Sequence, residues 1–195
     1  TAVNRNKNFL GHFLHGLKLK SYEFNRYKTK KKMRTISICI YGNKNKPSTH
    51  VQLKFKALEE GTFYARDLVS EPGNILHPDE YAKRLNSLKK DGLKVKIYNQ
   101  KKLKTLGMHS LLGVGMGSVR GSYLVTMEWN GVKNNSKPVA FVGKGVTFDT
   151  GGYSLKPARF MEDMTYDMAG SAAVVGLMKS LALRKAKINA VGVVG

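Results

Sequence analysis

Residues Pro138 to Met168 read PVAFVGKGVTFDTGGYSLKPARFMEDMTYDM and contain the most informative sequence of the chain. This stretch opens on the apolar run VAFV at residues 139–142, which predicts a buried strand of a parallel sheet. Lys144 follows this strand between two glycines, and Asp149 comes five residues later. Ligands of open α/β sheets bind at the carboxyl ends of the strands, so we expect a chemical site here.

Two carboxylates and two lysines lie on this strand–loop–helix segment. After Lys144 and Asp149, Lys156 comes directly before a proline, and Asp167 comes before a predicted helix. Each residue alone has a simpler explanation. Asp149 could hold the turn that follows it, and Asp167 could cap the helix. Lys144 could form a salt bridge with either carboxylate. Taken together at these intervals, the four residues favour a chemical site over separate caps and turns.

Outside this segment, helical and strand patterns alternate along the chain. Helical spacing and helix start signals predict helices at residues 1–20, 51–70, 78–91, 101–106 and 168–183. Alternating or β-branched runs predict strands at residues 35–41, 93–98, 123–129, 138–143 and 188–194. This order predicts the α/β class, with a mixed, largely parallel sheet flanked by helices.

The composition indicates a globular protein that works in a reducing compartment. The chain has 195 residues and is 42% hydrophobic, which is enough apolar material for one core. No apolar stretch approaches the roughly 18 residues of a membrane span, so no membrane association is expected. The single Cys39 excludes an intrachain disulfide and favours a cytoplasmic location.

The formal net charge of +21 raises an alternative function. Residues 1–50 carry 12 Lys and Arg against one acidic residue, and a basic run from Lys28 to Arg34 adjoins Tyr22, Phe24 and Tyr27. Basic residues with aromatic neighbours can bind nucleic acid through phosphate contacts and stacking. Lysine-rich solvated faces are the simpler explanation, and we favour it because no nucleic-acid-binding motif is recognisable.

The stretch from Pro138 also resembles a known family. GKGVTFDTGGYSLKP at residues 143–157 and MTYDMAGSAAV at residues 164–174 closely resemble the active-site segment of the leucyl (cytosol) aminopeptidases, which use two metal ions. The likeness continues upstream in RDLVSEPGNILHPDEYA (66–82), LGMHSLLGVGMGSV (106–119) and SYEFNRYKTKK (21–31). Collinear similarity to this family therefore runs along nearly the whole chain.

This resemblance implies a role for each of five residues, which follow one another at intervals of five, seven, eight and three residues. Lys144, Asp149 and Asp167 are the implied metal ligands, with Asp149 bridging the two ions. Lys144 can ligate a metal only as a neutral amine. Lys156 is the implied catalytic and substrate-binding residue, whose positive charge stabilises the oxyanion. Met164 is implied to line the pocket for the substrate side chain.

The implied function is hydrolysis of the N-terminal residue, preferably leucine or another apolar residue, from peptides. Two divalent metal ions are implied, with zinc expected and manganese or magnesium as alternatives at a site of mainly oxygen ligands. The family resemblance also implies a cytoplasmic homo-hexamer. Besides the nucleic-acid-binding module, a catalytically dead interaction protein stays open as an alternative.

The resemblance also sets an expectation for the extent of the chain. The family's later segment of the type NTDAEGR, which supplies further carboxylate ligands and an arginine, has no counterpart here. We therefore expect an internal piece of a longer enzyme that is inactive alone. Turn residues in GNKNKPST favour a domain boundary near residue 45. The expected division is 1–45 as the end of an N-terminal α/β domain, 46–70 as a linker and connecting helix, and 71–195 as the N-terminal part of a metallopeptidase catalytic domain.

Overall fold

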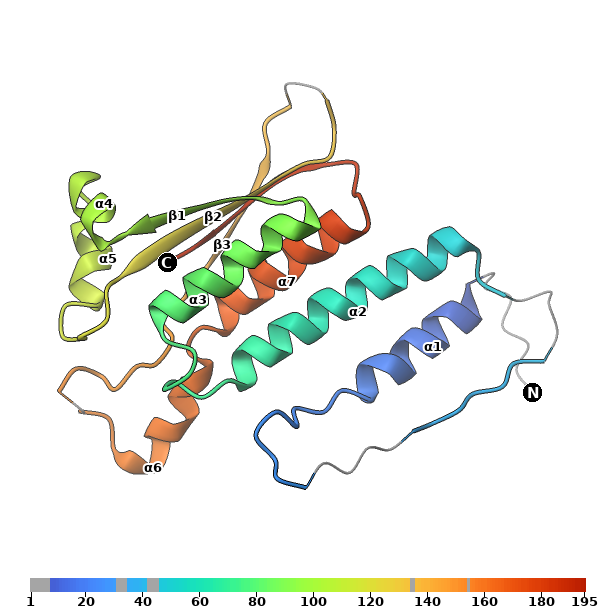
Figure 1. The fold of residues 1–195 in the computed structure, drawn as a ribbon, viewed down its shortest axis with the longest axis horizontal. Coiled ribbons are helices and arrows are strands. Elements are labelled where there is room, and N and C mark those ends of the chain that lie inside the picture. Colours follow the sequence, from blue (N-terminus) through green and yellow to red (C-terminus); the bar gives the residue numbers. More distant parts are fainter. Residues whose placement is uncertain (1–7, 31–34, 42–45, 134–135, 154) are drawn as a thin grey trace.

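The computed structural model describes residues 8–30, 35–41, 46–133, 136–153 and 155–195. Its strands form one mixed sheet in the spatial order β1-β2-β4-β3 (Figure 1). The strands are β1 Lys94–Asn99, β2 Tyr123–Asn130, β3 Val139–Gly143 and β4 Asn189–Val194. β3 pairs with β4 in parallel, whereas the β1–β2 and β2–β4 pairings are antiparallel. The predicted α/β class with a mixed sheet flanked by helices is confirmed.

The longer helices lie in successive layers against this sheet (Figure 1). α3 and α7 contact the strands, α2 packs against α7, and α1 packs against α2. The helices are α1 Phe9–Lys20, α2 Thr49–Ser70, α3 Pro78–Asn86, α4 Gln100–Thr105, α5 His109–Val114, α6 Ala158–Met161 and α7 Ala169–Leu183, with short 3-10 helices η1 Ser87–Asp91 and η2 Glu162–Tyr166. None of the helices in the described ranges is long and apolar enough to cross a membrane.

The predicted helices and strands are confirmed within a few residues in the described part of the chain, with one exception. Residues 1–7 of the helix predicted at 1–20 lie outside the described residues. Residues 35–41 form no strand, and their alternating Ile36, Ile38 and Ile40 side chains are exposed. A strand needs a partner to satisfy its backbone, and this segment pairs with no strand in the described part of the chain. The short helices α5 and α6 were not predicted. The proposed domain division stays a prediction.

The expectation of a largely parallel sheet is wrong for the described strands, because only one of the three pairings is parallel. Parallel neighbours need a connection that crosses back over the sheet, usually through a helix. Between β1 and β2 the chain instead forms α4 and α5, which lie together beyond the end of the sheet where β1 stops (Figure 1). The chain therefore returns antiparallel, and only β3, α7 and β4 form a crossover unit.

The prediction that residues 139–142 are buried is also wrong in the described structure. β3 is an edge strand in this sheet, with a hydrogen-bonded neighbour only on its β4 side. Its Val139 and Val142 side chains are 46% and 78% exposed. An apolar run indicates that a strand can be buried, but the covering elements decide whether it is.

The hydrophobic core lies between the sheet and helices α3 and α7. Met127 of β2, Leu85 of α3 and Met178 of α7 are all completely buried. Met168, directly before α7, is completely buried as well. Because Met168 is fixed in this core, the chain that enters α7 is fixed too.

A buried carboxylate joins the N-terminal segment to this core. The Glu71 side chain is fully buried at the end of α2 and contacts the guanidinium groups of Arg26 and Arg84. The Tyr27 hydroxyl donates a further hydrogen bond to it. A buried charge is tolerated only when it is paired and hydrogen-bonded, as it is here. Sequence patterns gave no sign of this cluster, because its members lie far apart in the chain.

Helices α2 and α7 approach each other through small residues. A Cβ added at Gly61 would lie 2.4 Å from the carbonyl oxygen of Gly176 and 2.0 Å from Ser180 Oγ. Ser180 Oγ also donates a hydrogen bond of 3.1 Å to the carbonyl of Ala57 across the interface. The alanine- and glycine-rich composition of α7 therefore permits close packing against α2 as well as against the sheet.

Gly61→Ala should destabilise the protein by about 1–3 kcal/mol, because the added methyl group overpacks this contact against a backbone carbonyl that cannot rotate away. The matched control is Gly16→Ala in α1, where an added Cβ meets nothing within 4 Å. Alanine is the better helix former, so the control should be neutral or stabilised by up to about 1 kcal/mol. Denaturant unfolding of both variants measures the difference. Equal stability of Gly61→Ala and wild type would contradict the assigned contact.

Candidate active site

The candidate residues lie on the segment that connects β3 to α7. Lys144 directly follows β3, and its carbonyl accepts a hydrogen bond of 3.0 Å from the backbone N–H of Ser171 in the first turn of α7. A Cβ at Gly143 would lie 2.5 Å from Ser171 Cα. Only glycine therefore lets the end of β3 approach α7 this closely, and this contact places Lys144 beside the start of α7.

Lys144 and Asp167 form the first of two charge pairs. The Lys144 Nζ donates to Asp167 Oδ1 at 2.8 Å. This hydrogen bond raises the pKa of Lys144, with a weaker contribution from the charge of Asp149, so the ammonium form is favoured. The other carboxylate oxygen, Asp167 Oδ2, is buried and has no hydrogen-bond partner in the described residues. A buried carboxylate oxygen without a partner is costly, so its environment suits a cation.

Asp149 and Lys156 form the second pair. The Lys156 Nζ lies 2.8 Å from Asp149 Oδ2 and 2.9 Å from Met164 Sδ. Asp149 Oδ1 accepts a hydrogen bond of 2.8 Å from the backbone N–H of Gly151. The pKa of Asp149 is lowered, foremost by the hydrogen bond from Lys156 and then by that from Gly151. Asp149 is therefore ionised at neutral pH.

The loop after Asp149 turns back through three residues with left-handed backbone. Gly151, Gly152 and Tyr153 have φ angles of 82°, 77° and 42°. The first two positions suit glycine, which has no Cβ to clash in this conformation. The backbone N–H of Lys156 then donates to the carbonyl of Thr150 at 3.0 Å. This turn folds Lys156 back onto Asp149, seven positions earlier in the sequence.

The structure decides between several simpler roles of these residues. Asp167 is not the helix cap: the N-cap of α7 is Met168, and no side chain caps that helix. Asp149 does hold the following turn through Gly151, and Lys144 does pair with a carboxylate. Neither role occupies the whole carboxylate group. Asp149 Oδ2 contacts Lys156, and Asp167 Oδ2 has no hydrogen-bond partner in the described residues, so both roles are compatible with a chemical site.

The site offers two carboxylates to a metal ion. Among the residues that the structure describes, no group of three or more His, Cys, Asp and Glu side chains could hold one. Asp149 and Asp167 nevertheless fit a divalent cation, because carboxylate oxygens are its preferred hard ligands and Asp167 Oδ2 is buried without a partner. The amine of Lys144, next to Asp167, is a further donor once it has lost its proton.

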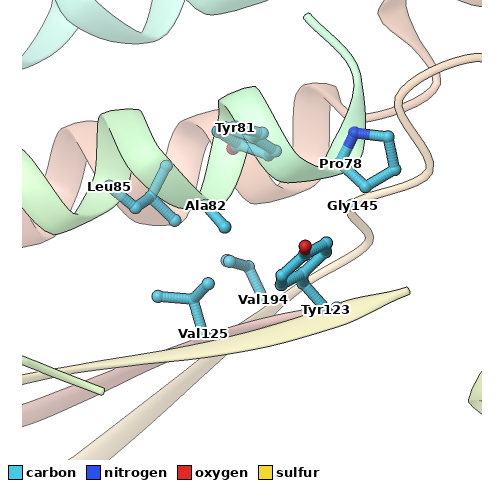
Figure 2. Close-up of a pocket in the computed structure, with 9 residues that line it drawn as sticks. Pro78, Tyr81, Ala82, Leu85, Tyr123, Val125, Gly145 and Val194 are labelled. Carbon is cyan, nitrogen blue, oxygen red and sulfur yellow. The ribbon is translucent and has the colours of Figure 1, made fainter. Parts of the chain in front are cut away.

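A small apolar pocket lies beside this segment, between α3 and the sheet (Figure 2). In Figure 2 the side chains of Tyr81, Ala82 and Leu85 on α3 face those of Val125 and Val194 on the strands. None of the five candidate residues lines it. The Tyr81 hydroxyl instead lies 2.9 Å from the hydroxyl of Ser171 in α7. The pocket is therefore part of the packing that supports the site and does not contain the charged groups.

Sequence reasoning missed some residues that shape the site. Phe148 packs against Gly73 from the turn between α2 and α3. A glycine in a turn and an aromatic residue beside an aspartate are common features, so neither signals a contact between the two. The basic run from Lys28 lies partly outside the described residues, at 31–34. Its described members Lys28 and Lys30 are exposed.

Comparison with known proteins identifies the family of this chain. The model of the cytosol aminopeptidase family, catalytic domain, matches residues 63–195. A probable cytosol aminopeptidase of Brucella ovis is 51% identical over 192 residues, covering 92% of this chain and 37% of that protein. One from Ehrlichia ruminantium is 47% identical over 200 residues, covering 100% of this chain and 40% of that protein. The chain thus spans about two fifths of the length of these curated relatives.

Two solved structures are also similar to this chain. The cytosol aminopeptidase of Coxiella burnetii matches with a TM-score of 0.82 and 26% identity, over 97% of this chain and 39% of that one. The bottromycin maturation enzyme BotP, solved in complex with Mn, matches with a TM-score of 0.80 and 29% identity, over 96% of this chain and 39% of that one. The family model covers the residues from the last part of α2 to β4, including the whole candidate site. The chain belongs to the cytosol aminopeptidase family.

Proposed function

We propose that the full-length protein is a metal-dependent aminopeptidase that removes the N-terminal residue, preferably leucine or another apolar residue, from peptides. The observation that carries this proposal is the convergence of five residues from the β3–α7 segment. They form the contacting groups Lys144–Asp167 and Asp149–Lys156–Met164. These are the residues for which the family resemblance implies metal, catalytic and substrate-binding roles.

We propose two divalent metal ions as cofactors, held by Asp149, Asp167 and Lys144, with zinc expected and manganese or magnesium as alternatives. The unpartnered Asp167 Oδ2 and the ionised Asp149 support this, as does the Mn complex of the relative BotP. Bound there, such ions would activate water and polarise the scissile carbonyl. Ligation by Lys144 requires its amine to lose a proton and to leave Asp167, which a nearby cation favours.

Lys156 is the proposed catalytic residue of this chain. Its ammonium group is held by Asp149 Oδ2 and by Met164 Sδ, so its position is fixed from two sides. A fixed positive charge near the scissile carbonyl stabilises the negative charge that develops on its oxygen in the transition state. Because Met164 contacts the same ammonium, a pocket for an apolar side chain at Met164 would lie directly beside the catalytic group.

The assembly, location and domain division are proposals as well. The family resemblance supports a cytoplasmic homo-hexamer, and the curated relatives are named cytosol aminopeptidases. The proposed catalytic part at 71–195 lies within the residues that match the family model. The N-terminal residues 1–45 and the connecting residues 46–70 complete the proposed division.

Asp149→Asn in the full-length protein should lose metal, because the substitution removes a charged ligand without changing the size of the side chain. Elemental analysis after dialysis should give lower occupancy than for wild type, and hydrolysis of leucine amide should fall in parallel. Chelation of the wild-type enzyme should abolish the activity, and returning Zn²⁺ or Mn²⁺ should restore it. Activity that survives thorough chelation would contradict the metal mechanism.

Lys156→Ala should separate catalysis from metal binding. Removal of an oxyanion-stabilising group lowers kcat by about 10²–10³-fold. Metal occupancy should stay at the wild-type level, because the proposed ligands are untouched. Steady-state kinetics with leucine amide, together with elemental analysis of the same sample, checks both statements. A variant with near-normal kcat would show that Lys156 has another role.

Residues 1–195 expressed alone should have no measurable aminopeptidase activity, because they correspond to about two fifths of the curated relatives' length. Metal affinity falls steeply when ligands are missing, so zinc should also bind weakly. A peptidase assay and zinc titration on the monodisperse fraction measure both properties. Tight binding of two metal ions with turnover would contradict this prediction.

A further inference from the structure

The backbone just before Asp149 is pressed against a different part of the fold. A Cβ built at Gly73 would lie 3.0 Å from Cδ2, 3.1 Å from Cγ and 3.1 Å from Cβ of Phe148. Such distances are shorter than ordinary van der Waals contact, so the Phe148 side chain occupies the space that any other residue at 73 would need. Gly73 and Asp149 are thus linked through one intervening residue.

Gly73 belongs to a turn that is itself well fixed. The backbone N–H groups of Ile75 and Leu76 both donate to the carbonyl of Pro72 at 2.9 Å. Leu76 is 1% exposed, and Glu71 at the other end is held by Arg26 and Arg84. The turn is therefore a rigid surface against which Phe148 can be positioned.

Other described anchors of the Asp149 loop lie before Phe148: the backbone N–H of Gly145 donates to the carbonyl of Gly195 at 2.9 Å, and Thr147 is buried. The hydrogen bonds described for the middle of the loop, Gly151 to Asp149, Lys156 to Thr150 and Leu155 to Gly152, stay inside the loop. Such bonds fix the internal shape of a loop but not its place on the protein. Contact with a rigid neighbouring element is what supplies that place.

We propose that Phe148 is a positioning residue for Asp149, and that contact with Gly73 holds Phe148 in place. The inference rests on the proposed function, in which Asp149 is a metal ligand. A methyl group at position 73 would press on the Phe148 ring and on its Cβ. Two of the three crowded atoms, Cγ and Cδ2, belong to the ring, so relief moves the ring off Gly73, and the chain directly before Asp149 loses the contact that holds it. Metal sites tolerate ligand displacements of only about 0.2 Å, so affinity for the ion should fall.

The test uses the full-length protein, stripped of metal, with Mn²⁺ as the probe. Gly73→Ala should raise the Kd for Mn²⁺ by about 10-fold, in the range found when groups that support metal ligands are changed. The matched control is Gly113→Ala, where an added Cβ meets nothing within 4 Å; it should bind Mn²⁺ like wild type. Thermal unfolding in chelator records any loss of stability separately from metal affinity.

A double-mutant cycle identifies Phe148 as the connection. Phe148→Ala removes the two ring atoms that crowd position 73, so it should weaken Mn²⁺ binding by itself. Adding Gly73→Ala to Phe148→Ala should then change the Kd by less than 3-fold, because contacting residues are not additive. If Gly73→Ala alone fails to fold, weaker Mn²⁺ binding by Phe148→Ala with an unchanged Tm in chelator still supports the inference.

Some outcomes would overturn the inference. One is a Gly73→Ala variant that loses thermal stability but binds Mn²⁺ like wild type. Another is an equal effect of Gly73→Ala with and without the Phe148 ring. The Asp149→Asn variant shows whether a negative result concerns the positioning role of Phe148 or the metal site itself. If it loses Mn²⁺ while Gly73→Ala does not, only the positioning role is wrong; if it keeps wild-type Mn²⁺ affinity, the metal site and this inference both fail.

Discussion

The contact between the end of β3 and the first turn of α7 is the constraint on which the candidate site depends. A side chain at Gly143 would collide with the backbone of Gly170 and Ser171, so the two elements meet without side chains between them. Lys144 directly follows the buried Gly143 and Asp167 directly precedes the buried Met168, and this contact brings the two side chains within 2.8 Å. The intervening loop must then close on itself, which returns Lys156 to Asp149.

The charges in the site are balanced in pairs, one lysine for each carboxylate. The Lys144, Asp149 and Lys156 side chains are 59%, 36% and 31% exposed, and that of Asp167 is 18% exposed. Ion pairs this exposed contribute little to stability, because water screens them and the long side chains lose rotational freedom. A divalent cation that takes the carboxylates would therefore compete with weak partners. The arrangement therefore suits the proposed function, because the carboxylates stay ionised and Lys144 can leave Asp167 when a cation binds.

Most helices and strands could be predicted from the sequence, because they depend on local pattern and spacing. The five candidate residues came from the family resemblance, and the structure brings them into contact, while their roles stay proposals. The apolar run of β3 was assigned correctly as a strand, but its burial depends on neighbours that periodicity does not specify. The same limit applies to strand direction, to the Glu71 cluster with Arg26 and Arg84, and to Phe148 on Gly73. Each of these arises from residues distant in the chain, and no local signal at either partner identifies the other.

Anomalous diffraction from crystals of the full-length protein soaked in Mn²⁺ shows whether a cation binds the two carboxylates of the site. Anomalous peaks are expected in contact with Asp149 and Asp167, with the Lys144 ammonium displaced from Asp167 Oδ1. Full retention of the Lys144–Asp167 pair at saturating Mn²⁺, without a peak at either carboxylate, would contradict the proposed metal site.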